Sequence, residues 1–155
     1  MSNNKSVEDL IRELREYRRK SMEGGGIERI RIQHAKGKLT ARERLSKLLD
    51  PDSFQELGWM VLTRSRYYEL LGIDFKKVKY LGDGVVAGFG KIDNRPVFVF
   101  AQDFTIMGGS IGEAHGLKIA RIIEMAIGNQ VPVIGLYSSG GARTQEEIAA
   151  LHDCG

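Results

Sequence analysis

The chain has 155 residues, 42% of them hydrophobic and 28% charged, with 19 glycines and a formal net charge of +3. This composition is typical of a globular domain and excludes a disordered chain. No apolar run approaches a membrane span, and the start MSNNKSVEDL resembles neither a signal nor a transit peptide. The single cysteine, Cys154, excludes an intrachain disulfide and suits a reducing cytosol. We therefore expect a cytoplasmic protein with no membrane segment in this chain.

The positive charge is concentrated in the first third of the chain. Residues 1–50 hold thirteen Lys and Arg against eight Asp and Glu, whereas residues 51–155 hold ten against twelve. A basic segment of this kind faces the phosphates of a ligand or partner, or is simply a solvated helical surface. Acidic residues interrupt the basic ones throughout and no reader motif is present, so we expect no nucleic-acid partner.

Two helices are predicted in this basic part. The first covers residues 6–22, begins with a Ser6/Asp9 capping box, and ends at the flexible joint Gly24-Gly25-Gly26. The second covers residues 40–49, where Thr40 and Glu43 form a capping box and Asp50-Pro51 stops the helix. We interpret residues 1–52 as a basic helical arm that lies outside the core. The first helix carries an apolar stripe of Val7, Leu10, Ile11, Leu14 and Tyr17.

From residue 53 the pattern is that of an α/β domain built from stacked ββα units. The helix at 110–127 is expected to turn Leu117, Ala120, Ile123, Ala126 and Ile127 inward. In chain order we predict a strand within 54–64, an irregular or helical insert at 66–82, a hairpin of 85–92 and 96–102 turning at Asp93-Asn94, a helix at 110–127, a buried strand at 131–138 and a helix from Thr144.

The last predicted helix stops after about two turns, at Gly155, and only one strand has the pattern of full burial. A short helix at a free end buries little and frays. We therefore expect residues 53–155 to be the front part of a longer domain.

Several familiar sites are not supported. Gly82, Gly84 and Ala87 have the spacing of a dinucleotide fingerprint, but a strand follows where that fingerprint needs a helix. Ser138 and Ser139 lack the context of a nucleophile elbow. The three histidines, His34, His115 and His152, lie on different elements without other ligands at metal spacing, so no metal is expected.

Two glycine-rich loops remain as candidates. Phe104–Ser110 and Ser138–Arg143 each follow a strand and precede a helix, so each presents backbone N–H groups with a favourable helix dipole behind them. Such donors can stabilise the enolate of a thioester. The alternative is that the glycines only permit tight turns, and the residues alone leave both readings open.

Three long segments carry a family resemblance. GKLTARERLSKLLDPDSFQELG, then GDGVVAGFGKIDNRPVFVFAQDFTIMGGSIGEAHGLKIARIIEMA, then PVIGLYSSGGARTQEE closely resemble the carboxyltransferase (beta) subunits of biotin-dependent acyl-CoA carboxylases, of the propionyl-CoA carboxylase type. The alpha subunits of biotin-dependent acyl-CoA decarboxylases share these motifs. The resemblance runs from about Ile32 to Gly155, and it implies the crotonase-like fold of an N-terminal carboxyltransferase domain.

The resemblance also implies a reaction. Carboxybiotin, carried by a biotin carboxyl carrier and loaded by a biotin carboxylase subunit, releases its carboxyl group in the site, and the biotin anion takes the α-proton of a short acyl-CoA. The thioester enolate then attacks CO2. No protein side chain has to act as the base, because the cofactor supplies the proton acceptor. The family works as oligomers in which a second, similar domain completes the site.

The family's residue roles carry over by motif. The N–H groups of Gly141 and Ala142 would form an oxyanion hole for the thioester, with Gly140 allowing close approach. Ser139 and the loop of Gly108 and Gly109 would line the same cleft. Arg143 would hold the loop or meet a carboxylate. The phosphates of coenzyme A, or else another subunit, would be met by Lys38, Arg42 and Arg44.

One position departs from the family pattern, because Ser138 stands where an Asp is expected before Ser-Gly-Gly-Ala-Arg. The resemblance leaves alternatives open as well. The chain could belong to a methylmalonyl-CoA type decarboxylase, or it could be a truncated, non-catalytic module that binds coenzyme A or other subunits. Without a second domain, we expect the 155-residue chain to be inactive alone.

Overall fold

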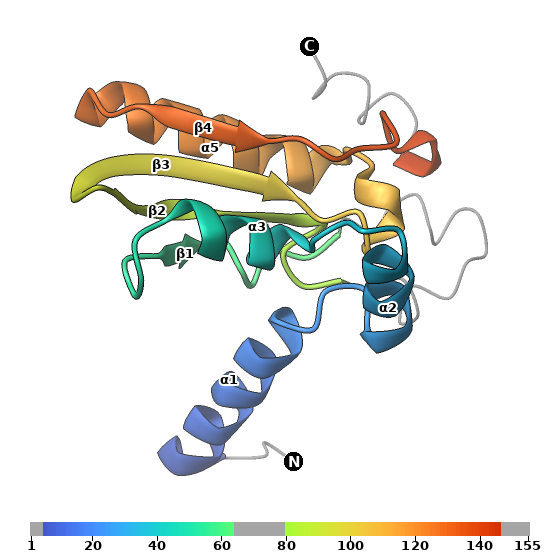
Figure 1. Cartoon of the computed structure of the whole chain (residues 1–155). Helices are drawn as coiled ribbons and strands as arrows, with labels where there is room; N and C mark the ends of the chain where they lie inside the picture. The colour runs from blue at the N-terminus through green and yellow to red at the C-terminus, as the bar shows by residue number, and fades with distance from the viewer. Residues whose placement is uncertain (1–4, 64–79, 147–155) are drawn as a thin grey trace.

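The computed structural model describes residues 5–63 and 80–146, and its centre is a mixed four-stranded sheet (Figure 1). The sheet order is β1-β2-β3-β4, with β1–β2 and β2–β3 antiparallel and β3–β4 parallel. Helix α5 (Glu113–Asn129) connects β3 to β4. This hairpin–helix–strand order confirms the predicted α/β class. The strands are β1 (Gln55–Leu57), β2 (Val85–Ile92), β3 (Arg95–Gln102) and β4 (Val133–Leu136).

The β2–β3 hairpin forms at the predicted turn. Asp93 and Asn94 have φ angles of 49° and 63°, the left-handed conformation that a two-residue hairpin turn requires. Their backbone N–H groups donate to the carboxylate of Asp50, at 3.0 and 2.8 Å. The turn residues and a carboxylate from the preceding segment therefore fix the register, in which Ile92 pairs with Arg95.

One helix covers each face of the sheet. Helix α3 (Ala41–Leu48) packs Ala41 and Leu45, each 1% exposed, against β2 and β3 on one face, and α5 packs on the other. The prediction that this segment lies outside the core is therefore wrong, and the core spans both sides of the predicted boundary at residue 52. The basic residues that suggested a detached arm occupy the outer side of an amphipathic helix. The core on the α3 side consists of Ala41, Leu45, Leu49, Val86, Val97, Val99 and Ala101.

Helix α5 uses a different face from the one predicted. Ile122 and Ala126 are buried against the sheet, whereas Leu117, Ile123 and Ile127 are 47%, 37% and 72% exposed. Of the predicted inner set only Ala126 is buried. Two polar residues, His115 and Lys118, share the buried side because each finds hydrogen-bond partners beneath the helix. Hydrophobicity alone could not indicate such a face.

The described residues 5–50 contain three helices, of which the sequence predicted the first and the third but not the second. Helix α1 (Val7–Ser21) begins with the predicted Ser6/Asp9 capping box and projects away from the sheet (Figure 1). Its predicted apolar stripe is exposed, with values from 44% at Ile11 to 67% at Val7. Helix α2 (Ile27–Ala35) follows Gly26, which offers no side-chain cap. That missing cap removed the usual start signal.

Two of the three glycines between α1 and α2, Gly24 and Gly25, pack closely against the loop after β3, whereas a Cβ on Gly26 would meet open space. A Cβ on Gly25 would lie 1.9 Å from the carbonyl oxygen of Thr105, and the Gly25 N–H donates to the Thr105 side chain at 2.9 Å. The expected flexible joint is therefore a close contact between the helical segment and the loop after β3. Glycine is required there because no side chain fits.

The remaining differences concern the edges of the fold. The strand expected within 54–64 is only three residues long, and β4 is half-exposed instead of buried, with Val133 40% exposed. The expected last helix begins as a short 3₁₀ turn at Thr144–Glu146, and its remainder lies outside the described residues, as does most of the insert at 66–82. Among the described strands, β4 has a single neighbour, β3.

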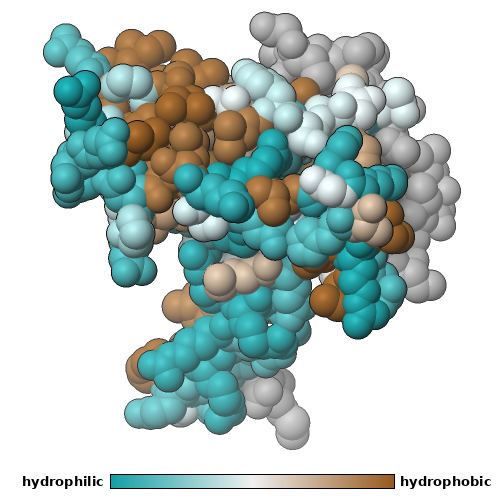
Figure 2. All heavy atoms as spheres, viewed as in Figure 1, coloured by the Kyte–Doolittle hydropathy of each residue, from teal (hydrophilic) through white to brown (hydrophobic). Residues whose placement is uncertain are grey.

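Apolar side chains gather at the surface over the end of the sheet where β4 and α5 lie, whereas the visible side of α1 is mainly hydrophilic (Figure 2). In the part of the chain that the structure describes, no helix is long and apolar enough to span a membrane.

Replacing Leu45 with Ala tests whether α3 belongs to the core. Because Leu45 is 1% exposed and packs against β2 and β3, Leu45→Ala should lower the free energy of unfolding by about 2–5 kcal/mol. The matched control, Leu14→Ala on the exposed stripe of α1, should change it by less than about 0.5 kcal/mol. Urea denaturation of the 155-residue chain measures both, and equal small effects would contradict the placement of α3.

Candidate active site

The two glycine-rich loops lie side by side at one end of the sheet. The Gly140 N–H donates to the carbonyl oxygen of Gly108 at 2.9 Å. A Cβ on Gly109 would lie 2.1 Å from the carbonyl oxygen of Ser138, and Gly109 has a φ of 66°. Only glycine fits that position. The structure thus brings together the two segments that sequence analysis predicted to share a cleft.

The N–H of Ala142 is the clearest free donor on the second loop. The Gly141 carbonyl accepts from Ile111 N–H at 2.9 Å, and Arg143 N–H donates to the Ile111 carbonyl at 2.8 Å. In a trans peptide the C=O and the next N–H point to opposite sides. The Ala142 N–H therefore points away from Ile111, and it has no hydrogen-bond partner among the described residues.

Two other N–H groups of the loop are occupied by partners within the chain. Gly141 N–H donates to the Ser139 hydroxyl at 3.0 Å, and Gly141 has a φ of 101°, which disfavours any other residue. Ser138 N–H donates to the Gln102 side-chain oxygen at 2.9 Å. Of the two predicted oxyanion donors, Ala142 is open and Gly141 is closed by a local turn.

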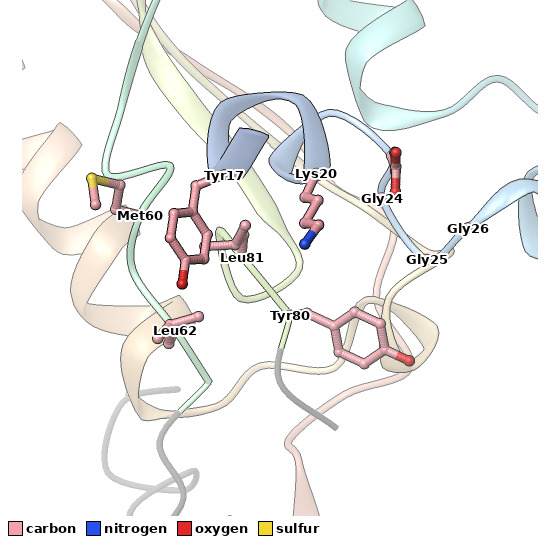
Figure 3. A pocket seen from close by; sticks show the side chains of 10 residues that line it. Tyr17, Lys20, Gly24, Gly25, Gly26, Met60, Leu62, Tyr80 and Leu81 are labelled. Atoms are coloured by element: carbon pink, nitrogen blue, oxygen red, sulfur yellow. The ribbon is translucent and has the colours of Figure 1, made fainter. Parts of the chain in front are cut away.

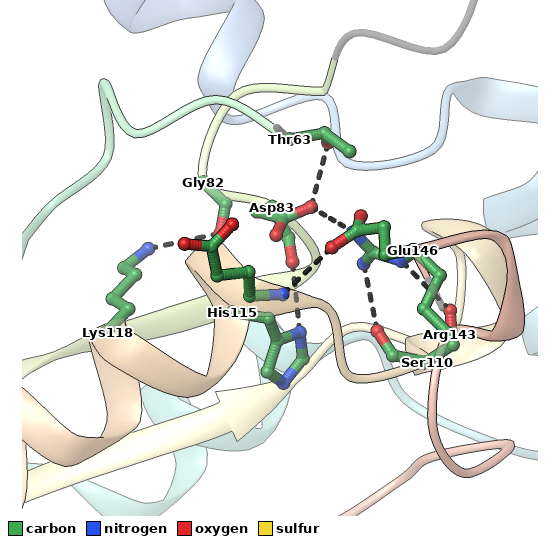
Figure 4. Close-up of polar contacts among 9 residues, drawn as sticks. Thr63, Gly82, Asp83, Ser110, His115, Lys118, Arg143 and Glu146 are labelled. Atoms are coloured by element: carbon green, nitrogen blue, oxygen red, sulfur yellow. Dashed lines mark hydrogen bonds and ion pairs between the residues drawn. The ribbon is translucent and has the colours of Figure 1, made fainter. Parts of the chain in front are cut away.

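Arg143 is fully buried and joins several elements (Figure 4). Its guanidinium pairs with Asp83 at 2.6 Å and Glu146 at 2.8 Å. It also donates to the Ser110 hydroxyl and carbonyl at 3.2 and 2.8 Å. Both roles left open for Arg143 are present, since it holds the loop and meets carboxylates of its own chain. The side chain of Arg143 is 0% exposed, so it is not available to contact a substrate. The prediction that placed Arg143 among the substrate-binding residues is therefore wrong.

The cluster around Arg143 binds the loop to the rest of the fold. Glu146 also accepts from the Glu113 N–H at 2.8 Å, at the first turn of α5, and Asp83 accepts from Thr63 at 2.7 Å. Burial raises the pKa of Asp83, against the opposite effect of Arg143. Burial alone would lower the pKa of Arg143, but the charge of Asp83 and the contact with Glu146 raise it. One guanidinium therefore serves two buried carboxylates.

Two further ionisable groups lie beneath the loops. Burial lowers the pKa of His115 to about 4, and this side chain is 0% exposed. Burial lowers the pKa of Lys118 to about 8, and its ammonium donates to the carbonyls of Val85 and Gly82 at 2.5 and 3.3 Å. Both groups hold the turn at Gly82–Val85 rather than face the loop opening. No His, Cys, Asp and Glu cluster suited to a metal occurs among the described residues.

The basic residues predicted to meet phosphates behave differently from one another. Arg42 makes two hydrogen bonds to Glu56, at 2.9 Å each, and a third to the Ser21 carbonyl. Arg44 donates to the carbonyls of Gln102 and Leu136 at the ends of β3 and β4. These two arginines are committed inside the fold, whereas Lys38 is exposed.

Two hollows lie along the segment of residues 17–36. The larger, about 730 Å³, lies between the end of α1, the three glycines and residues 60–62 and 80–81, with Tyr17, Lys20 and Tyr80 on its walls (Figure 3). The smaller, about 260 Å³, lies between α2 and residues 104–108. Of these two hollows, only the smaller is lined by described residues of a glycine loop, namely Phe104, Thr105, Met107 and Gly108.

The family follows from a comparison with known protein families. Residues 32–155 match the carboxyl transferase domain. The chain belongs to this family. Its fold is the crotonase-like α/β fold of the carboxyltransferases, as predicted from the three sequence segments, and the resemblance to propionyl-CoA carboxylase beta chains is confirmed.

Several known members of the family resemble the chain closely. The propionyl-CoA carboxylase beta chain of Roseobacter denitrificans is 46% identical over 145 residues, which cover 94% of this chain and 28% of the relative. The methylmalonyl-CoA decarboxylase subunit alpha of Veillonella parvula is 45% identical over 146 residues, with the same coverage. A transcarboxylase 12S crystal structure, a hexamer with methylmalonyl-coenzyme A bound, superposes with a TM-score of 0.88 at 41% identity over 97% of this chain and 28% of that one. The chain thus spans about a quarter of the length of these relatives.

Sequence reasoning missed the residues that hold the loops. Asp83, Glu146 and His115 come from three different elements, and no motif spacing connects them. The signal in the sequence was Asp83 between two glycines, a pattern typical of a tight turn, and in the structure Asp83 has a left-handed φ of 47°.

Removing the buried cation should damage the whole cluster. Arg143→Met leaves Asp83 and Glu146 buried without their partner, and we expect a loss of about 3–5 kcal/mol in the free energy of unfolding. The control Arg121→Met removes an exposed pair with Glu124 and should cost at most about 1 kcal/mol. Chemical denaturation at neutral pH compares them. Similar losses in both variants would show that the cluster does not hold the fold.

His115 should make stability depend on pH. Its pKa is about 4 in the folded chain and about 6.5 when unfolded, so between these values only the unfolded chain binds the proton. Stability should therefore fall as the pH drops from about 6.5 towards 4. His115→Gln should remove this contribution to the slope. Denaturation midpoints across pH 4.5–8 measure it, with His34→Gln as the exposed control. Parallel pH profiles for wild type and His115→Gln would contradict the assignment.

Proposed function

We propose that this chain supplies the acyl-CoA side of a carboxyltransferase site, which moves a carboxyl group to the α-carbon of a short acyl-CoA such as propionyl-CoA. The observation that carries the proposal is the open Ala142 N–H, set between two tightly packed glycine loops in a member of the carboxyl transferase family. The names of the relatives support this substrate class: two act on propionyl-CoA or methylmalonyl-CoA, and a third was solved with methylmalonyl-coenzyme A.

The proposed role of the second loop is to stabilise negative charge on the thioester oxygen. When the α-proton leaves the acyl group, charge develops on that oxygen, and a fixed N–H aimed at it lowers the barrier. Ala142 supplies such a donor. Gly141 becomes a second donor only if its N–H exchanges the Ser139 hydroxyl for the substrate oxygen, since the two lie 3.0 Å apart. Gly140 and Gly141 allow the acyl group to approach the backbone because they carry no side chain.

The residues around the loops fit a reaction in which a cofactor brings the base. The side chains of the exposed part of the second loop, Ser139–Ala142, include no ionisable group. Biotin on a carrier partner would supply the carboxyl group and the acceptor for the α-proton. This chain would bind and orient the thioester, and the biotin carrier, a biotin carboxylase and further subunits would complete the enzyme. A homo-oligomer and a cytoplasmic location remain predictions.

The proposed site for coenzyme A is the smaller hollow, beside the first glycine loop. The 260 Å³ hollow is lined by Gly108 and Met107 at the loop and by Arg29 and Lys36 of α2 and its end. We propose that Lys38 and these cations, in place of Arg42 and Arg44, meet the phosphates. The Ser138 that replaces the expected Asp uses its backbone N–H, not its side chain, to anchor the loop.

A second function has specific support. The Veillonella decarboxylase subunit is 45% identical to this chain, against 46% for the Roseobacter carboxylase chain. It would use the same thioester donors in the reverse direction, because loss of CO2 from methylmalonyl-CoA forms the same enolate. A non-catalytic coenzyme A-binding module is the third alternative. The binding experiment below separates this third alternative from the first two.

Calorimetry on the 155-residue chain tests the oxyanion donor. The ligands are propionyl-CoA and a nitroethyl thioether of coenzyme A, whose ionised nitronate imitates the enolate charge. If Ala142 N–H stabilises that charge, the nitronate should bind more tightly than propionyl-CoA. Ala142→Pro, which lacks the N–H, should weaken nitronate binding about 100-fold.

Ala142→Gly is the matched control, because it keeps the N–H and should bind the nitronate as the wild type does. Equal affinities for the two ligands, unchanged in Ala142→Pro, would leave only a coenzyme A-binding module. No heat with either ligand at millimolar concentration would overturn the site in this chain.

A further inference from the structure

A buried chain of polar groups links the turn before β2 to the start of the second glycine loop. Ser138 N–H donates to Gln102 Oε1 at 2.9 Å. Gln102 Nε2 lies 3.4 Å from His115 Nε2, and His115 Nδ1 lies 2.9 Å from the carbonyl oxygen of Asp83. Gln102 and His115 are both 0% exposed. The four residues come from a turn, β3, α5 and the loop itself.

The two ends of this chain fix the direction of every hydrogen bond in it. The Ser138 N–H can only donate, so Gln102 must turn its oxygen to Ser138 and its NH2 group to His115. The Asp83 carbonyl can only accept, so His115 must carry its proton on Nδ1 and accept at Nε2. The neutral tautomer of His115 is thus specified by two backbone groups. The low pKa of about 4 agrees with it.

We propose that Gln102 is a positioning residue for the oxyanion loop, and that Nδ1-protonated, neutral His115 keeps the Gln102 amide in its working orientation. The consequence for catalysis rests on the proposed function. The positioning itself does not. A flipped Gln102 amide would set its NH2 group against the Ser138 N–H, two donors face to face, and the loop start would lose its anchor.

The geometry of the loop explains why this anchor matters. Ser138 is held by Gln102 at one end and Arg143 is held by Asp83 at the other, so the free Ala142 N–H lies between two fixed points. Both anchors lead to Asp83, one through its carbonyl and His115, the other through its carboxylate. The carbonyl of Ser138 faces Gly109 with no space for a Cβ. A shift at Ser138 would therefore move the donor relative to the first loop.

Nuclear magnetic resonance on the ¹⁵N-labelled 155-residue chain tests the proposal. In the wild type at pH 7, His115 should show one ring proton, on Nδ1, and an unprotonated Nε2. Gln102→Leu removes the acceptor of Ser138, so the exchange of the Ser138 amide proton should become at least ~10-fold faster. Asn129→Leu, which removes an exposed amide bonded to the Met125 carbonyl, is the matched control and should leave Ser138 unchanged.

Gln102→Glu supplies a signature that a purely structural role would not produce. Its carboxylate still accepts from Ser138, so slow exchange of that amide should be restored. Its second oxygen faces His115 Nε2 as an acceptor, so the ring should take up a second proton and the pKa of His115 should rise. A second ring N–H at pH 6–7 is the expected result, and this variant remains informative if Gln102→Leu does not fold.

Two results would overturn the proposal: a wild-type His115 protonated on Nε2, or a Ser138 amide that does not respond to Gln102→Leu. Nitronate binding then separates positioning from function. Tight binding that Gln102→Leu leaves unchanged would reject the positioning role while the oxyanion site stands. The expected NMR signature without ligand binding in the wild type would support the positioning and reject the function.

Discussion

The buried ion pair between Arg143 and Asp83, 2.6 Å long, is the interaction on which the rest of the site depends. Charges are costly to bury unless they are paired and hydrogen-bonded, so a guanidinium with 0% exposure requires a set of acceptors inside the fold. Asp83, Glu146 and Ser110 supply that set from three separate segments. Because each acceptor has one place in the fold, the loop that carries Arg143 has one place as well.

This constraint explains how a loop of small residues becomes rigid. Gly140, Gly141 and Ala142 have almost no side-chain packing of their own, and glycine loses much conformational freedom on folding. The rigidity comes from the ends, through Gln102 at Ser138 and the ion pairs at Arg143. A donor that is held before the substrate arrives needs no reorganisation when charge develops, which is the property that oxyanion stabilisation requires.

The sequence predicted the local elements of the fold better than their packing. Both capping boxes, the Asp93-Asn94 turn and the two glycine loops depend on neighbours in the chain, and the structure contains all of them. Helix α2 was missed because Gly26 gives no capping signal. The face of α5 was misjudged because His115 and Lys118 are polar, and polar residues are buried only where distant partners satisfy them.

The sequence by itself determined the family, the α/β class and the loop whose backbone carries the candidate donor, because these depend on residue types in local order. Tertiary structure alone decided what the charged residues do. The sequence predicted that Arg42, Arg44 and Arg143 would bind a ligand, yet each donates to acceptors of its own chain. Arg42 binds Glu56, Arg44 binds the Leu136 carbonyl at the end of β4, and Arg143 binds Asp83. A guanidinium binds whichever carboxylate or carbonyl the fold brings within reach, and that proximity is not written in spacing along the chain.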